Sequence, residues 1–222
     1  MVKCCMTLLE NRVAAGRQLA LAIKKTGEDA IVLAIPRGGV VVGFEVAKSL
    51  GVALDVIVTK KIGAPDNPEL AIGAVAEDGT FFVDDDLVSR LYVSKEYIRE
   101  EVEKQRQEIQ RRLFRYRGNE PYPGLKGREV IVVDDGVATG ATLKAALRLV
   151  RSKGAKNVTV AVPVGPPDTI SELEEYADDV VCLLTPEPFY AIGQFYTDFS
   201  QTSDEQVTEL LRLSRKNRLP RR

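Results

Sequence analysis

Short apolar runs occur at intervals along the chain, and most are rich in β-branched residues with no polar position between them. This pattern is typical of strands that are buried on both faces of a parallel sheet. The runs cover residues 30–35, 53–59, 130–133, 157–162 and 180–184.

Between these runs, apolar residues recur every three or four positions, which predicts helices with one buried face. Helices are expected over about 9–23, 41–50, 143–150, 168–176 and 203–215. Because strands and helices alternate, the sequence predicts the α/β class, with a doubly wound, mainly parallel sheet in a single domain over residues 1–222.

The segment 72–124 departs from this alternation and is expected to be an insertion. Asp78-Gly79 lies between two apolar runs, which predicts a hairpin. After Ser94, a narrow apolar stripe runs along a highly charged stretch, as in a long helix that is mostly exposed and lies on the body or on a partner subunit. Four arginines near the end of this helix are better explained by the favourable helix dipole there than by a patch that binds nucleic acid or phosphate. They are Arg111, Arg112, Arg115 and Arg117.

The stretch 130–142 carries the clearest chemical pattern. It reads VIVVDDGVATGAT: a buried strand, two acids (Asp134 and Asp135), a turn of small residues and the start of a helix. Such a turn directs backbone amides at an anion, and Thr139 and Thr142 add hydroxyl donors. Two adjacent carboxylates would repel a bare phosphate. The implied ligand is therefore a phosphorylated sugar with free hydroxyls and a metal ion.

This stretch resembles the phosphoribosyl-diphosphate (PRPP) motif of the type I phosphoribosyltransferases. The resemblance implies that Asp134 and Asp135 hold the ribose hydroxyls. It also implies that they hold Mg²⁺, either directly or through those hydroxyls or water. The loop would bind the 5-phosphate, and its residues are Gly136, Ala138, Thr139, Gly140, Ala141 and Thr142.

A second strand, glycine turn and helix occur at Pro36-Arg37-Gly38-Gly39. The glycines allow a ligand to approach the backbone, and Arg37 can bind a phosphate with its planar guanidinium. By the same resemblance, this loop would hold the pyrophosphate of PRPP.

Lys60 and Lys61 follow the strand at 53–59 and precede the glycine- and proline-containing segment 62–70. The segment resembles the flexible loop that closes over the active site in the family, so we expect a mobile basic flap. One of the two lysines is expected to reach the pyrophosphate. Since side chains alternate along a strand, only one would face the ligand, and the sequence does not choose between them.

Aromatic residues concentrate between Phe189 and Phe199. They are expected either to seal the edge of the sheet or to stack on a flat acceptor ring through Phe189 or Tyr190.

The resemblance implies transfer of ribose 5-phosphate from PRPP to a nitrogen acceptor that resembles a nucleobase, with release of pyrophosphate. The catalytic candidates are Asp134, Asp135, Lys60 and Lys61, and either carboxylate could be the base. One alternative is a non-catalytic protein that binds PRPP to regulate transcription. A phosphorelay receiver is disfavoured, because its acid pair follows the first strand.

Composition narrows the possible classes of function further. The net charge of −1 implies no general affinity for nucleic acid or an anionic membrane, and the absence of histidine excludes Ser-His-Asp and Cys-His catalysis. Glu10 ends the first apolar run too early for a signal peptide. The adjacent Cys4 and Cys5 are poorly placed for a disulfide. A cytoplasmic location is expected, with a homo-oligomer left open.

Overall fold

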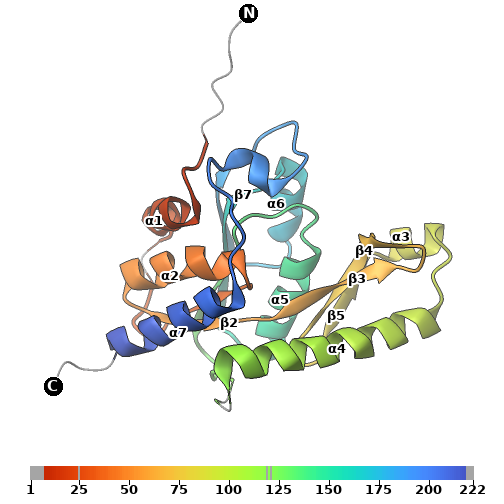
Figure 1. Cartoon of the computed structure of the whole chain (residues 1–222), viewed down its shortest axis with the longest axis horizontal. Helices are drawn as coiled ribbons and strands as arrows, with labels where there is room; N and C mark the ends of the chain where they lie inside the picture. The colour runs from red at the N-terminus through yellow and green to blue at the C-terminus, as the bar shows by residue number, and fades with distance from the viewer. Residues whose placement is uncertain (1–7, 25, 119, 121, 219–222) are drawn as a thin grey trace, which may run out of the picture.

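A five-stranded parallel sheet lies at the centre of the computed structural model, which describes residues 8–24, 26–118, 120 and 122–218 (Figure 1). Cys4 and Cys5 lie outside these residues. All five strands are parallel, in the order β2–β1–β6–β7–β8, which confirms the predicted α/β class. The strands are β1 (Ile31–Ala34), β2 (Ala53–Val56), β6 (Glu129–Val133), β7 (Asn157–Val164) and β8 (Asp179–Leu184).

Helices cover both faces of this sheet. One face carries α1 (Arg12–Ala22), α2 (Gly38–Leu50) and α7 (Asp204–Arg218), and the other carries α5 (Ala141–Ser152) and α6 (Pro167–Leu173) (Figure 1). A short 3-10 helix, η1 (Ile192–Phe195), follows β8. The sheet is therefore doubly wound.

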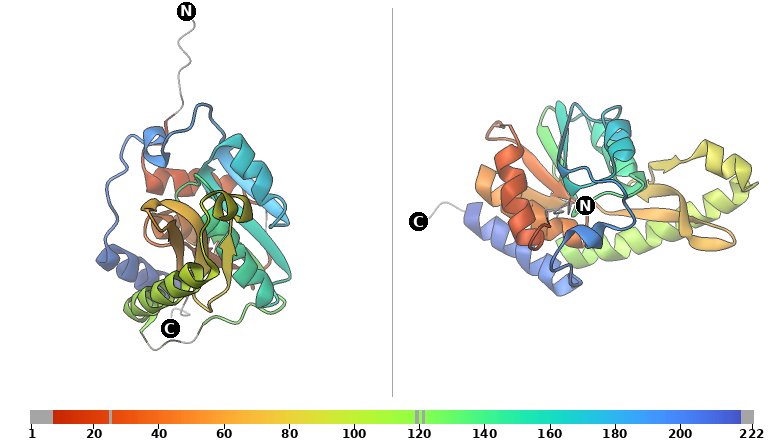
Figure 2. Two further views of the ribbon diagram at one scale, coloured as in Figure 1. Left: turned by 90° about the vertical axis from the view of Figure 1, so that its right-hand side faces the viewer. Right: turned by 90° about the horizontal axis from the view of Figure 1, so that it is seen from above.

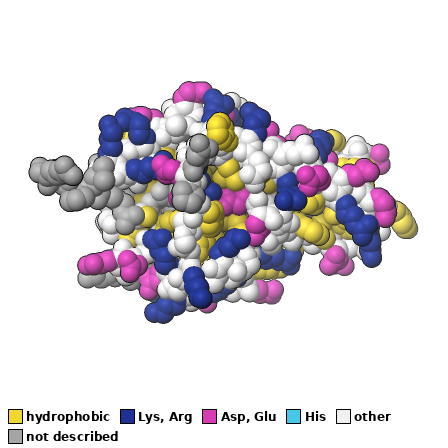
Figure 3. Space-filling view, turned by 90° about the horizontal axis from the view of Figure 1, so that it is seen from below, with side chains coloured by type: hydrophobic (Ala, Val, Ile, Leu, Met, Phe, Trp, Pro, Cys, Tyr) yellow, Lys and Arg dark blue, Asp and Glu magenta, His cyan; other side chains and the backbone are white. Residues whose placement is uncertain are grey.

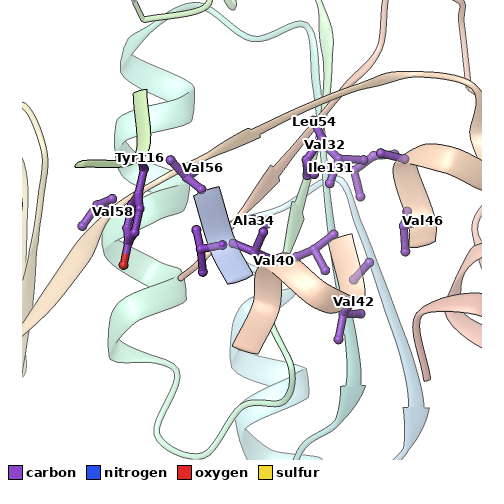
Figure 4. Close-up of a cluster of buried hydrophobic side chains, with 14 of the residues drawn as sticks. Val32, Ala34, Val40, Val42, Val46, Leu54, Val56, Val58, Tyr116 and Ile131 are labelled. Carbon is purple, nitrogen blue, oxygen red and sulfur yellow. The ribbon is translucent and has the colours of Figure 1, made fainter. Parts of the chain in front are cut away.

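Side chains of the central strands alternate between two hydrophobic cores. Val32 and Ile131 pack towards Val40 of α2, in the cluster shown in Figure 4. Their neighbours Leu33 and Val132 pack on the opposite face, in the cluster that includes the apolar side of α5. Burial on both faces explains why these strands have continuous apolar sequences.

A second, antiparallel sheet and two helices project from the body, and we call residues 59–117 the arm (Figures 1 and 2). The arm contains β3 (Thr59–Ala64), β4 (Asn67–Ala76), β5 (Phe81–Val83), α3 (Asp85–Arg90) and α4 (Lys95–Arg117). The hairpin at Asp78-Gly79 and the long charged helix are as predicted. The arm begins at Thr59, earlier in the chain than the expected start of the insertion at residue 72.

Most of the segment 62–70, which is expected to act as a mobile flap, belongs to a β-hairpin. Lys61 pairs with Ala74 and Ile62 pairs with Gly73 across β3 and β4. Ile62 and Ile72 are fully buried, and they supply the apolar anchors that a free flap would lack. Closure of the hairpin over a ligand stays a prediction.

The root of the arm is fixed to the body by buried charges. The Arg117 guanidinium lies 3.0 Å from Asp55 of β2 and 3.4 Å from Glu77, and all three side chains are largely buried. Tyr116 donates a hydrogen bond to Asp204 of α7. The arginine cluster therefore does more than complement the helix dipole, since Arg117 ties α4 to the central sheet.

Acidic and basic side chains are interspersed on the face shown in Figure 3. This distribution agrees with the balanced net charge. Within the described part of the chain, none of the helices is both long enough and apolar enough to cross a bilayer.

Candidate active site

A cavity of about 400 Å³ lies at the carboxyl ends of β1 and β6. Its walls come from the β1–α2 and β6–α5 loops, the start of α1, the strand β3 and the segment after η1. In open α/β sheets, ligands bind at this edge, where loops from several strands meet. Four stretches were singled out from the sequence, and only some of their residues reach this cavity.

The β6–α5 loop forms one wall through Ala138, Thr139, Gly140 and Thr142. Gly140 precedes α5 with a left-handed backbone (φ +73°), and no described side chain caps the helix. The first-turn amides and the helix dipole are therefore available to an anion. Ala141 is the exception among the predicted loop residues, since its side chain is buried in a small alanine cluster.

The two acids of the motif have different surroundings. Asp134 is partly buried and lines the cavity, and its Oδ1 accepts a hydrogen bond from the Asp135 amide at 2.8 Å. Burial and the adjacent Asp135 together raise the pKa of Asp134 well above its usual value. The Asp135 carboxylate instead forms an ion pair with Arg12 at 2.6 Å. Both acids are thus partly buried.

Arg12 is a cavity residue that the sequence reasoning missed. Its Nε donates to Asp135, its Nη1 donates to the carbonyl of Ser200 at 2.7 Å, and its guanidinium lies 3.9 Å above the Phe199 ring. Tyr196 holds the same residue through its backbone, by donating a hydrogen bond to the Asp135 carbonyl at 2.7 Å. One signal was present: Arg12 begins α1, where the helix dipole disfavours a cation.

The β1–α2 loop packs directly on the acid pair. A Cβ on Gly39 would lie 2.9 Å from the Cα of Asp134, so only glycine permits this approach. Gly38 and the exposed Arg37 line the cavity at the N-terminus of α2, and no described side chain caps that helix. The first turns of α2 and α5 therefore both present free amides to the same space.

Only one of the two predicted lysines lines the cavity, and it is Lys61. Lys60 points to the other face of β3, towards α4. There, partial burial and the nearby Arg112 lower its pKa. Because side chains alternate along the strand, the two lysines lie on opposite faces of β3, as the sequence analysis predicts.

The predicted aromatic contacts lie outside the cavity lining. The Phe189 ring packs on Phe195 with centroids 5.0 Å apart, and Tyr190 is 82% exposed. Ile192 and Phe199, from the same aromatic stretch, line the cavity instead. Stacking of an acceptor on Phe189 or Tyr190 therefore stays a prediction that would require movement.

A parallel sheet whose strand-end cavity combines an acid pair with two uncapped helix starts is typical of an α/β protein that binds an anionic ligand. The family model of the phosphoribosyl transferase domain matches residues 7–200, and the chain belongs to this family.

Three relatives are informative. The chain is 47% identical over 207 residues to "Putative phosphoribosyl transferase MT0597" of Mycobacterium tuberculosis, covering 93% of this chain and 47% of that protein. It therefore spans about half the length of this curated relative. The crystal structure of TT1426 from Thermus thermophilus is 41% identical, covers 92% of this chain and 97% of that one, and has a TM-score of 0.78. Adenine phosphoribosyltransferase of Rhodococcus jostii is 62% identical over 39 residues, 18% of this chain and 22% of that enzyme.

Proposed function

We propose that the protein transfers the ribose 5-phosphate of PRPP to a nitrogen acceptor and releases pyrophosphate. The observation that carries this proposal is the single cavity in which the acid pair, two uncapped helix starts, Arg37 and Lys61 meet. PRPP carries a 5-phosphate, a diphosphate and two ring hydroxyls, and the cavity contains separate groups that could bind each of them.

Each wall has a distinct proposed role. The α5 amides and Thr142 bind the 5-phosphate, because an uncapped helix start favours an anion. Arg37, the Gly38 amide and Lys61 bind the pyrophosphate. Asp134 and Asp135 accept hydrogen bonds from the ribose hydroxyls.

Mg²⁺ is the cofactor that the proposal implies. This ion is usually held by one or two carboxylates together with substrate phosphates and water. The donor set fits that mode, since Asp134 lines the cavity while Asp135 is already paired with Arg12. Across the described residues, no three His, Cys, Asp or Glu side chains form a metal cage. The bound ion would neutralise charge on the departing pyrophosphate.

The reaction would pass through an oxocarbenium-like state at the sugar carbon, as in glycoside transfer. The carboxyl groups of Asp134 and Asp135 stabilise positive charge that develops on the ring. Either acid could take the proton of the acceptor nitrogen. The acceptor is proposed to be a small planar nitrogen heterocycle of the nucleobase kind.

Isothermal calorimetry with PRPP and Mg²⁺, followed by turnover assays with a panel of nucleobases, tests the proposal. We expect binding that is lost in the Asp134→Asn, Asp135→Asn double variant, and pyrophosphate release with at least one base. Absence of heat at millimolar PRPP would refute the proposal. Tight binding without turnover of any base would favour the alternative, a regulatory protein that binds PRPP.

A further inference from the structure

Thr59 places a buried hydroxyl group beside the cavity. The residue is the first of β3, it is 8% exposed, and it contributes to the cavity lining. The described part of the chain offers no hydrogen-bond partner to its Oγ1 atom. A buried hydroxyl without a partner destabilises the folded state, and such groups are rare in native proteins. Valine has almost the same shape and would avoid this cost, so the hydroxyl requires an explanation.

The surroundings of Thr59 indicate what its partner would be. Thr59 and Lys61 are two positions apart on β3, so their side chains share the face that borders the cavity. Arg37 and Gly38 line the same cavity, at the N-terminus of α2. Besides the acid pair, the cavity that Thr59 lines thus contains two cations and free helix amides, and these groups favour a ligand that accepts hydrogen bonds and carries negative charge. A phosphate oxygen meets both conditions.

We propose that the Thr59 hydroxyl donates a hydrogen bond to an oxygen of the diphosphate group of the bound sugar. This inference rests on the proposed function and adds to it a ligand contact that no motif in the sequence indicates. Thr59 then has two opposed effects. It lowers the stability of the free protein, and it increases the affinity for the diphosphate.

The isosteric substitution Thr59→Val tests both effects. Without ligand, we expect the unfolding midpoint to rise by about 2–4 °C, because the unpaired hydroxyl is removed. Calorimetry with Mg²⁺ should show about tenfold weaker binding of PRPP and of inorganic pyrophosphate, with ribose 5-phosphate affinity unchanged. Thr59→Ser restores the hydroxyl and should recover most of the affinity.

Thr169 supplies a matched stability control. Its hydroxyl is equally buried but donates to the Ala138 carbonyl at 2.8 Å. Thr169→Val should therefore lower the unfolding midpoint, opposite in sign to Thr59→Val.

Each remaining outcome is decisive. If Thr59→Val lowers the midpoint, the hydroxyl is already satisfied in the free protein and the inference is wrong. If it binds PRPP as tightly as the unaltered protein, or loses affinity for ribose 5-phosphate instead of pyrophosphate, the inference is also wrong while the proposed function stands. If the unaltered protein binds neither PRPP nor pyrophosphate, the proposed function itself fails, and this contact with it.

Discussion

Replacement of Arg12 by glutamine should damage both stability and ligand binding. The ion pair of Arg12 with Asp135 is 2.6 Å long, and the two side chains are only 11% and 14% exposed. Breaking a fully buried pair typically costs about 3–5 kcal/mol, and an exposed pair contributes about 0–1 kcal/mol. The small remaining exposure places Arg12→Gln below the fully buried range, at about 2–3 kcal/mol of unfolding free energy.

The effect on binding follows from the position of Asp135. Without the guanidinium, this carboxylate loses the partner that holds it at the cavity wall, and a neighbouring acid repels it. We expect PRPP affinity to fall at least tenfold, because misplacing a ligand-binding group by about 1 Å is costly. Arg12→Lys restores the charge but not the planar contact with Phe199, so it should recover the affinity only in part.

Urea unfolding and calorimetry with PRPP and Mg²⁺ measure the two effects. Arg17→Gln is the matched control, because Arg17 lies on the same helix and pairs with Glu45 at 2.9 Å while its side chain is 65% exposed. That variant should lose about 0.5 kcal/mol and retain its PRPP affinity. Equal stability losses in the two variants, with PRPP affinity unchanged in both, would refute the assigned role of Arg12.

Three further predictions concern other parts of the molecule. Burial raises the pKa of Glu77 from 4.5 to about 7, so the folded state binds this proton more tightly than the unfolded state. The stabilisation from this proton is complete below about pH 4.5, and up to about 3 kcal/mol of it is lost as the pH rises through 7. In urea unfolding at several pH values, Glu77→Gln should remove most of this pH-dependent loss of stability. Lys61→Ala should weaken pyrophosphate binding about tenfold by calorimetry, whereas Lys60→Ala should change it less than about twofold, since only Lys61 lines the cavity. Phe189→Ala should lower the unfolding free energy by about 3 kcal/mol, because its ring packs on Phe195. Tyr190→Ala should leave stability unchanged, because Tyr190 is exposed. If the Tyr190 ring stacks on the acceptor, this variant should also bind the acceptor about tenfold more weakly. An acceptor affinity that is unchanged in both aromatic variants would exclude the stacking.

Local residue order was sufficient to predict the parallel sheet and the small-residue loop between β6 and α5. Both are encoded by neighbouring residues: continuous β-branched runs for strands buried on two faces, and small residues between a strand and a helix for the loop. The positions of Asp134 and Thr142 at the cavity follow from this local order, because the carboxyl end of β6 lies at one edge of the sheet.

The hairpin of the arm depends on packing between distant segments. Gly63 and Pro68 give residues 62–70 a weak local preference for a strand. Burial of Ile62 and Ile72 in the core overrides that preference. The contribution of distant apolar contacts exceeds that of local propensity, and such contacts leave no periodic pattern within a short segment.

The surroundings of the acid pair also depend on the folded arrangement. Arg12 and Asp135 are separated by 123 positions, and only the packing of α1 beside the sheet brings them to 2.6 Å. The same holds for Thr59, whose burial depends on how the arm leaves the body. An ion pair or an unpaired hydroxyl is a property of two or more distant segments in contact. A linear sequence specifies each side chain but not which other side chains it meets.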